Sequence, residues 1–234
     1  MMALPKIDLP LFEMKLPSSG EMIKYRPFTV KEEKILLIAQ EADDPTQEVM
    51  AVKQIVNNCL PDIEVDELAM FDLEYIMLVL RSRSVDNTVD FSITDPDTEE
   101  NVKLTLDIED VIVKTIDGHT NEISINDEFM LYLKYPTINE FLKIMKLDAS
   151  DPLVNYFMMI SCLDKIASED EVHFFKDYSD EETDAFVENF SSQVVKGIQI
   201  FFETMPKLRH EIKYTNKNKD EKTFVVEGMR SFFI

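Results

Sequence analysis

The chain has little glycine, cysteine and histidine, and it has no tryptophan. Four glycines are too few to build the glycine-rich loops on which phosphate and dinucleotide sites depend. The three histidines, His119, His173 and His210, are scattered, and none stands at zinc-site spacing from a cysteine or another histidine. The sequence therefore predicts no bound cofactor and no metal site.

Long apolar runs are also missing. No run approaches the roughly 20 residues of a membrane-spanning helix. Residues 1–10 contain prolines and an aspartate where a signal peptide needs an apolar stretch. Cys59 and Cys162 stand in apolar, helical stretches, where a cysteine usually serves as a small core residue. We expect a protein that stays in a cytoplasm without a membrane partner and without a structural disulfide.

Acidic residues dominate the charge. The chain has 46 aspartates and glutamates against 24 lysines and arginines, which gives a formal net charge of -22. Such a chain repels phosphate backbones, which argues against direct nucleic-acid binding. The acidity either steers the protein toward basic partners or only provides a solvated surface.

No constellation of catalytic residues is recognisable. Carboxylate pairs are so abundant that no particular pair indicates acid–base chemistry. The stretch from Asp95 to Glu100 lacks the glycine and the distant glutamate of a calcium loop, so it is read as an acidic hairpin turn. The sequence predicts no enzyme, and an enzyme with carboxylates assembled from distant residues is the remote alternative.

Local patterns predict hairpins at both ends of the chain. Alternating apolar residues flank a turn at residues 17–20, and a second hairpin is expected around a polar loop at residues 216–221. Further alternation predicts a hairpin with its turn at residues 95–101 and two more strands near residues 123–125 and 129–135.

Helices are expected between these strands. Capping boxes at Thr29–Glu32 and Thr137–Glu140 and the cap at Ser179 each mark a helix start, and Asp44-Pro45 marks another. Apolar spacing predicts further helices over residues 66–83, 153–167 and 194–205.

The element order favours an α+β fold, with helices, a small antiparallel sheet in the middle and hairpins near both termini. We expect three segments within one compact unit. Residues 1–87 form a hairpin with helices, residues 88–135 form the antiparallel β region, and residues 136–234 are helical with the C-terminal hairpin.

Exposed apolar ends are the candidate contact surfaces. The C-terminal residues 229–234 contain few polar side chains, so they either dock into the protein's own core, which the sequence favours, or insert into a partner. The predicted partner-binding residues are Phe12, Met229, Phe232 and Phe233.

Several segments together resemble one protein family. They are residues 26–37, residues 71–75 continuing at 80–85, residues 133–136, and residues 201–208 with the terminal residues 227–233. In order and spacing they are similar to the baseplate hub subunit and baseplate hub assembly proteins of T-even-like contractile-tailed bacteriophages. The resemblance covers nearly the whole chain, and the combination carries it, since no one segment is specific.

The resemblance implies a role in building the central hub of the tail baseplate through protein–protein contacts. The protein would act as a chaperone-like assembly factor on hub or tape-measure partners in the host cytoplasm, or it would remain in the virion as a structural subunit. The strong acidity favours the soluble, transient holder. The sequence predicts neither the oligomeric state nor the partner.

Overall fold

The computed structural model describes residues 8–42, 44–84, 87–147 and 153–228 and divides into two compact units. Unit 1 comprises Met1–Lys114 and Lys207–Ile234, and unit 2 comprises Thr115–Pro206. These boundaries differ from the three expected segments, because the strands within residues 88–135 are shared between the two units. Lys114 and Lys207 are register partners, so unit 2 is inserted between two paired strands of unit 1.

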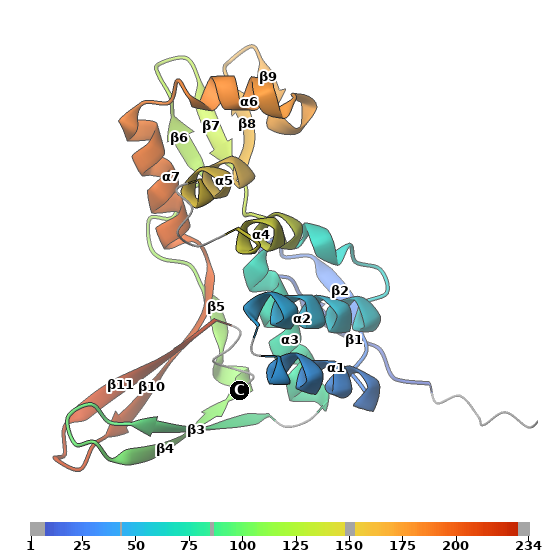
Figure 1. Ribbon diagram of the computed structural model, residues 1–234, viewed down its shortest axis with the longest axis vertical. Coiled ribbons are helices and arrows are strands. Elements are labelled where there is room, and N and C mark those ends of the chain that lie inside the picture. Colours follow the sequence, from blue (N-terminus) through green and yellow to red (C-terminus); the bar gives the residue numbers. More distant parts are fainter. Residues whose placement is uncertain (1–7, 43, 85–86, 148–152, 229–234) are drawn as a thin grey trace, which may run out of the picture. The chain divides into compact units, whose positions relative to one another are not determined.

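Unit 1 begins with a hairpin and three helices (Figure 1). The hairpin was expected: β1 (Phe12–Lys15) pairs with β2 (Met22–Tyr25), and Gly20 in the turn has a φ of 73°, which favours glycine. The helices are α1 (Val30–Glu41), α2 (Pro45–Cys59) and α3 (Met70–Ser84), with a short 3-10 turn, η1 (Val65–Glu67), before α3.

The segment from Arg26 to Thr29 ties the ends of all three helices together. The Arg26 amide donates to the carbonyl of Cys59 at the end of α2, and the Phe28 amide donates to Ser84 Oγ at the end of α3. Glu32, in the first turn of α1, is fully buried and accepts hydrogen bonds from the Thr29 amide and hydroxyl at 2.9 and 2.6 Å. The Arg26 guanidinium lies 3.1 Å from the same carboxylate. The Glu32 half of the predicted capping box is therefore present, with a buried ion pair beside it, whereas the Thr29 hydroxyl accepts the Lys31 amide at 3.4 Å in place of the Glu32 amide.

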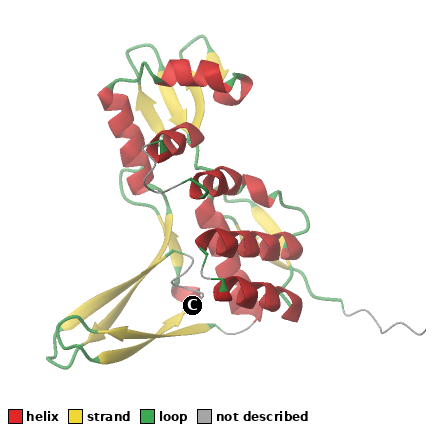
Figure 2. Ribbon diagram, viewed as in Figure 1, coloured by secondary structure: helices red, strands yellow, loops and turns green. Residues whose placement is uncertain are grey.

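Two hairpins of unit 1 lie face to face. The first joins β3 (Thr88–Thr94) and β4 (Asn101–Asp107), and the second joins β10 (Lys207–Thr215) and β11 (Glu221–Glu227). A turn η2 (Ile108–Asp110) and the strand β5 (Ile112–Lys114) follow β4, and β5 pairs with β10. Phe91 and Phe224 meet between the hairpins with ring centroids 6.2 Å apart. Figure 2 shows the two hairpins extending away from the helices of the unit, whereas β5 and β10 contact α3.

Asp95 joins the tips of the two hairpins by hydrogen bonds. It is fully buried, and its carboxylate accepts from the amides of Asp97 and Thr98 within its own turn and from the Tyr214 hydroxyl at 2.8 Å. Burial alone would raise the pKa of Asp95, but these hydrogen bonds outweigh it and lower the pKa. Ion pairs of Lys217 with Glu100 and of Lys222 with Asp97 also link the tips. The acidic stretch is thus a hairpin turn, as expected.

Unit 2 packs helices on one four-stranded antiparallel sheet. The sheet order is β6 (Glu122–Ser124), β7 (Met130–Leu133), β8 (Leu163–Ala167) and β9 (Val172–Phe174). The helices are α4 (Ile138–Met145), α5 (Val154–Ser161), α6 (Asp180–Val187) and α7 (Ser192–Thr204), and a turn η3 (Phe175–Asp177) precedes α6. The core contains Leu131, Leu163, Val194, Ile198 and Phe201. A Cβ on Gly197 would lie only 3.0 Å from Ile123, so glycine allows α7 to approach β6 closely.

The α+β prediction is confirmed, although several elements differ in detail. The expected helix over residues 153–167 is wrong in its second half, where β8 pairs with both β7 and β9. The periodicity of the sequence could not distinguish a helix from a strand here, because a short apolar run suits a buried helix or a buried strand equally. The helix expected from residue 66 begins at Met70, since Leu68 is extended. The strands expected as one sheet over residues 88–135 belong to two sheets, and β5, a strand that was not expected, belongs to a third.

The buried ion pair predicts a measurable pH dependence of stability. Burial alone would raise the pKa of Glu32, but hydrogen bonds from Arg26 and Thr29 lower it to about 2, against 4.5 for a free glutamate. A lowered pKa stabilises the fold above pH ~4.5, and this contribution is lost as the pH falls toward 2. We expect Glu32→Gln to lower the free energy of unfolding by about 2–4 kcal/mol at pH 7, measured by urea denaturation. The difference should shrink below pH ~4.5, and Glu33→Gln, an exposed neighbour, is the control; equal losses in both variants would refute the role of the pair.

Asp72 predicts the opposite effect. Its side chain is fully buried in α3, Oδ1 accepts the Ser18 amide at 3.0 Å, and Oδ2 has no hydrogen-bond partner among the described residues. Burial raises the pKa of Asp72, more than the bonds from Ser18 lower it, so its contribution to stability is lost as the pH rises. We expect Asp72→Asn to raise the unfolding free energy at pH 7 by about 1 kcal/mol, with the gain fading toward pH ~4. The exposed Glu67→Gln is the control, and destabilisation by Asp72→Asn at every pH would contradict this account.

Candidate interaction site

The residues predicted to bind a partner do not form one described site. Phe12 lies in β1, where its ring is 5.8 Å from that of Tyr25 and 5.9 Å from the Arg83 guanidinium carbon. It is 37% exposed, so part of the ring remains open to a partner. Met229, Phe232 and Phe233 lie outside the described residues. A role of these four residues in partner binding stays a prediction.

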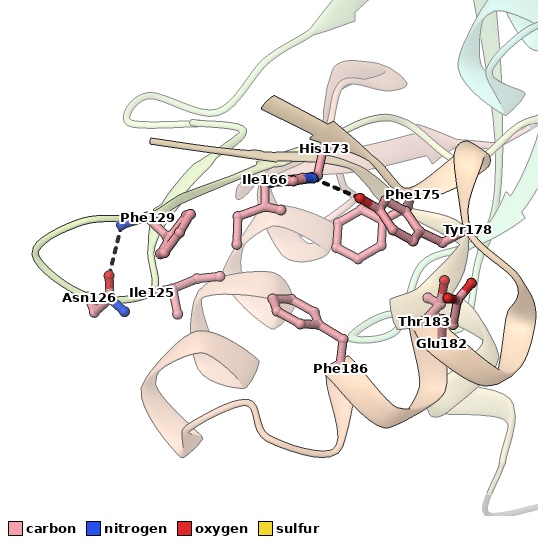
Figure 3. Close-up of a pocket in the computed structure, with 10 residues that line it drawn as sticks. All are labelled: Ile125, Asn126, Phe129, Ile166, His173, Phe175, Tyr178, Glu182, Thr183 and Phe186. Carbon is pink, nitrogen blue, oxygen red and sulfur yellow. Dashed lines mark hydrogen bonds between the residues drawn. The ribbon is translucent and has the colours of Figure 1, made fainter. Parts of the chain in front are cut away.

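Unit 2 contains an aromatic cavity that the sequence did not predict. Its volume is about 560 Å³, within the range of natural ligand sites. Figure 3 shows side chains converging on it from the β6–β7 loop, from β8 and β9, and from the segment leading into α6. We call it the aromatic pocket, and it is lined by Ile125, Asn126, Phe129, Ile166, His173, Phe175, Tyr178, Glu182, Thr183 and Phe186.

The walls of the aromatic pocket rest on the core of unit 2. Ile125 and Phe175 pack against the buried cluster that contains Leu131 and Leu163. The rings of Phe175 and Phe186 lie 5.8 Å apart, and Phe186 also meets Phe190 edge-on at 5.5 Å. Yet Phe186 remains 37% exposed. The pocket is therefore a supported, partly open apolar surface of the kind in which interface anchors are buried.

Polar groups stand at the rim of the pocket. His173 Nδ1 lies 2.7 Å from the Tyr178 hydroxyl, and its Nε2 lies 3.1 Å from Glu171. Asn126 Oδ1 accepts the amides of Glu128 and Phe129, which fixes the β6–β7 loop (Figure 3). These bonds hold the rim in place and leave the interior of the pocket apolar.

A capping box fixes the helical wall of the pocket. Ser179 Oγ accepts the Glu182 amide, and the Glu182 carboxylate accepts the Ser179 amide at 2.9 Å. The bonds from the Ser179 amide and hydroxyl lower the pKa of Glu182. Because Glu182, Thr183 and Phe186 all line the pocket, the start of α6 determines where its wall lies.

A second cavity of unit 2, of about 550 Å³, adjoins the first. We call it the acidic cleft. It shares Phe175, Tyr178 and Thr183 with the aromatic pocket, and its remaining lining residues are Lys134, Glu140, Phe157, Ile160, Leu163, Asp164, Lys176, Asp180 and Asp184.

The histidines and carboxylates show no metal-binding arrangement in the described part of the chain, where no group of three or more potential ligands is close enough to hold an ion. His119 stacks on Tyr135 and Phe201 and lies 2.9 Å from Thr204, so it is a packing residue. Burial lowers its pKa. Within the same described ranges, no helix is long and apolar enough to cross a membrane.

The capping box yields a test of the pocket wall. We expect Ser179→Ala to remove one cap bond and cost about 1 kcal/mol of local stability. Hydrogen exchange at the amides of α6 should then become about fivefold faster, while exchange in α7 stays unchanged. Ser192→Ala, at the exposed start of α7, is the matched control. Identical exchange in α6 for both variants would show that the box does not fix this wall.

Comparison with known proteins gives one match. The family model described as T4 bacteriophage base plate protein matches residues 9–234, which is nearly the whole chain and both units. Neither the curated proteins nor the solved structures include a significant match. The match agrees with the resemblance seen in the sequence. The chain belongs to the family of T4-type bacteriophage base plate proteins.

Proposed function

We propose that this base plate protein assembles the hub of the phage tail by protein–protein contact and not by catalysis. It holds hub or tape-measure components in a chaperone-like manner in the host cytoplasm until they are built into the baseplate. The observation that carries the proposal is the aromatic pocket, a supported apolar cavity with partly exposed aromatic walls. Sites of this form suit anchoring side chains of a partner.

The charge of the chain supports a soluble holder. A formal net charge of -22 keeps copies of the protein apart and disfavours contact with the phage genome. Partner surfaces that are exposed before the hub closes would be covered by the holder until they reach their final contacts.

A stoichiometric structural subunit of the hub is the second candidate function. The observation that favours it is the pair of hairpins in unit 1, whose tips are joined by the buried Asp95 and by two ion pairs. Such a fixed element suits permanent packing in a particle.

Mass spectrometry of purified mature particles and of infected-cell lysate distinguishes the two functions. The holder is expected to be abundant in lysate and absent from particles, because it leaves once its client is incorporated. Several copies per particle would overturn the transient role and establish the structural one. The major tail proteins of the same particles serve as the internal standard for stoichiometry.

Affinity capture from the same lysate tests whether the protein works through baseplate partners at all. We expect the full chain to retain hub or tape-measure proteins, identified by peptide sequencing. Capture of none of these proteins, from a lysate in which they are detected, would refute both forms of the proposal.

A further inference from the structure

We propose that the aromatic pocket and the acidic cleft together bind one extended partner segment, which places an aromatic or large aliphatic side chain in the pocket and lysine or arginine in the cleft. This rests on the proposed function, because it names the chemistry of the partner that the function requires.

The first step is that the two cavities adjoin. Phe175, Tyr178 and Thr183 line both of them, and all three belong to the segment formed by η3 and the start of α6. In an extended chain, successive side chains lie roughly 3.3 Å apart along the backbone. A segment anchored in one cavity therefore reaches the other within a few residues.

The second step is the chemistry of the aromatic pocket. Phe129, Phe175 and Phe186 provide ring surfaces, and Ile125 and Ile166 provide aliphatic ones. A buried ring gains from edge-on and offset contacts with such walls beyond the area that it covers. An aromatic or large aliphatic anchor fits this lining, whereas a charged side chain would lose its hydration there.

The third step is the charge of the acidic cleft, whose lining contains four carboxylates and two lysines, Lys134 and Lys176. Glu140 is already paired with Lys134 at 2.7 Å, and Asp184 accepts the Tyr156 hydroxyl. Asp164 and Asp180 make no side-chain hydrogen bond or ion pair within the ranges that the structure describes. These two carboxylates are available to a cationic side chain of the partner.

The surroundings carry the same sign of charge. The sequence of unit 2 contains no arginine, and its acidic residues outnumber its lysines by about three to one. Exposed acids also flank the aromatic pocket, including Asp127, Glu128 and Glu171. Electrostatic complementarity therefore selects a basic partner segment.

Two other occupants must be distinguished from such a partner. A second copy of this chain would bring a like-charged unit 2 against the cleft. The chain's own residues 229–234, Met-Arg-Ser-Phe-Phe-Ile, combine aromatic side chains with one arginine. They lie outside the described residues, and the experiment includes them as a competitor.

Fluorescence anisotropy with three labelled short peptides tests the proposal on the full chain. The first peptide carries Phe-Leu flanked by lysine and arginine, the second replaces the basic residues by glutamate, and the third replaces Phe-Leu by alanine. We expect the first peptide to bind at least about tenfold more tightly than either of the others, and its binding to weaken as salt is raised. Equal binding of the first and second peptides would overturn the charge requirement, and equal binding of the first and third would overturn the anchor.

Variants locate the binding. Phe186→Ala should weaken the first peptide about tenfold, whereas Phe174→Ala, an aromatic of similar exposure that does not line either cavity, should not. The double variant Asp164→Asn/Asp180→Asn should also weaken it, whereas Asp62→Asn/Glu64→Gln removes the same charge elsewhere and should not. Equal effects of the target and control variants would refute the assignment. It would also be refuted if an unlabelled peptide of residues 229–234 displaced the labelled first peptide at a lower concentration than the unlabelled first peptide does.

The same variants separate this inference from the proposed function. Undiminished capture of hub or tape-measure proteins by Phe186→Ala would leave the function standing and remove the site. If the peptide bound but no baseplate protein were captured, the proposed binding site would be supported and the proposed function refuted.

Discussion

The buried carboxylate of Glu32 is the contact on which the helical part of unit 1 depends. It caps α1 through Thr29 and holds Arg26, whose amide bonds the end of α2, while the nearby Phe28 amide bonds the end of α3. A carboxylate without exposure to water is costly unless hydrogen bonds or a paired charge compensate for its lost hydration, and Glu32 has both. The segment from Arg26 to Thr29, between β2 and α1, therefore has one favourable conformation. Its hydrogen bonds fix the start of α1 and the ends of α2 and α3.

One local motif serves three different purposes in this chain. A glutamate three residues after a threonine or serine caps α1, α4 and α6. At α1 the carboxylate is buried with an arginine, at α4 it pairs with Lys134, and at α6 it lies at the rim of the aromatic pocket. The motif determines where a helix starts. The surrounding residues determine whether that helix start stabilises the fold or forms part of a surface site.

The sequence predicted what depends on neighbouring residues and missed what depends on distant pairing. The capping boxes and the hairpin turns were predictable because their donors and acceptors lie within a few positions. Residues 163–167 form a strand only because β7 and β9 pair with them, and β9 itself has three residues. The aromatic pocket needs that sheet, since Ile166 and His173 reach it from β8 and β9. The sequence placed Phe186 in a helix as an apolar residue. The neighbouring residues did not show which face of that helix is left exposed.

The proposed site places an aromatic pocket beside carboxylates that have no partner among the described residues. The two parts would contribute to binding in different ways, and the combination suits temporary holding. Long-range attraction to a basic segment raises the rate of encounter and is weakened by salt or by a competing basic surface, whereas the anchor side chain determines how long the complex lasts. A partner held in this way would be released when its own assembly offers the same side chains a larger interface, because the proposed site contributes one pocket and a few charges. Under the proposed function, the acidity that attracts such a segment would also repel a second copy of this chain and keep the site open for a client.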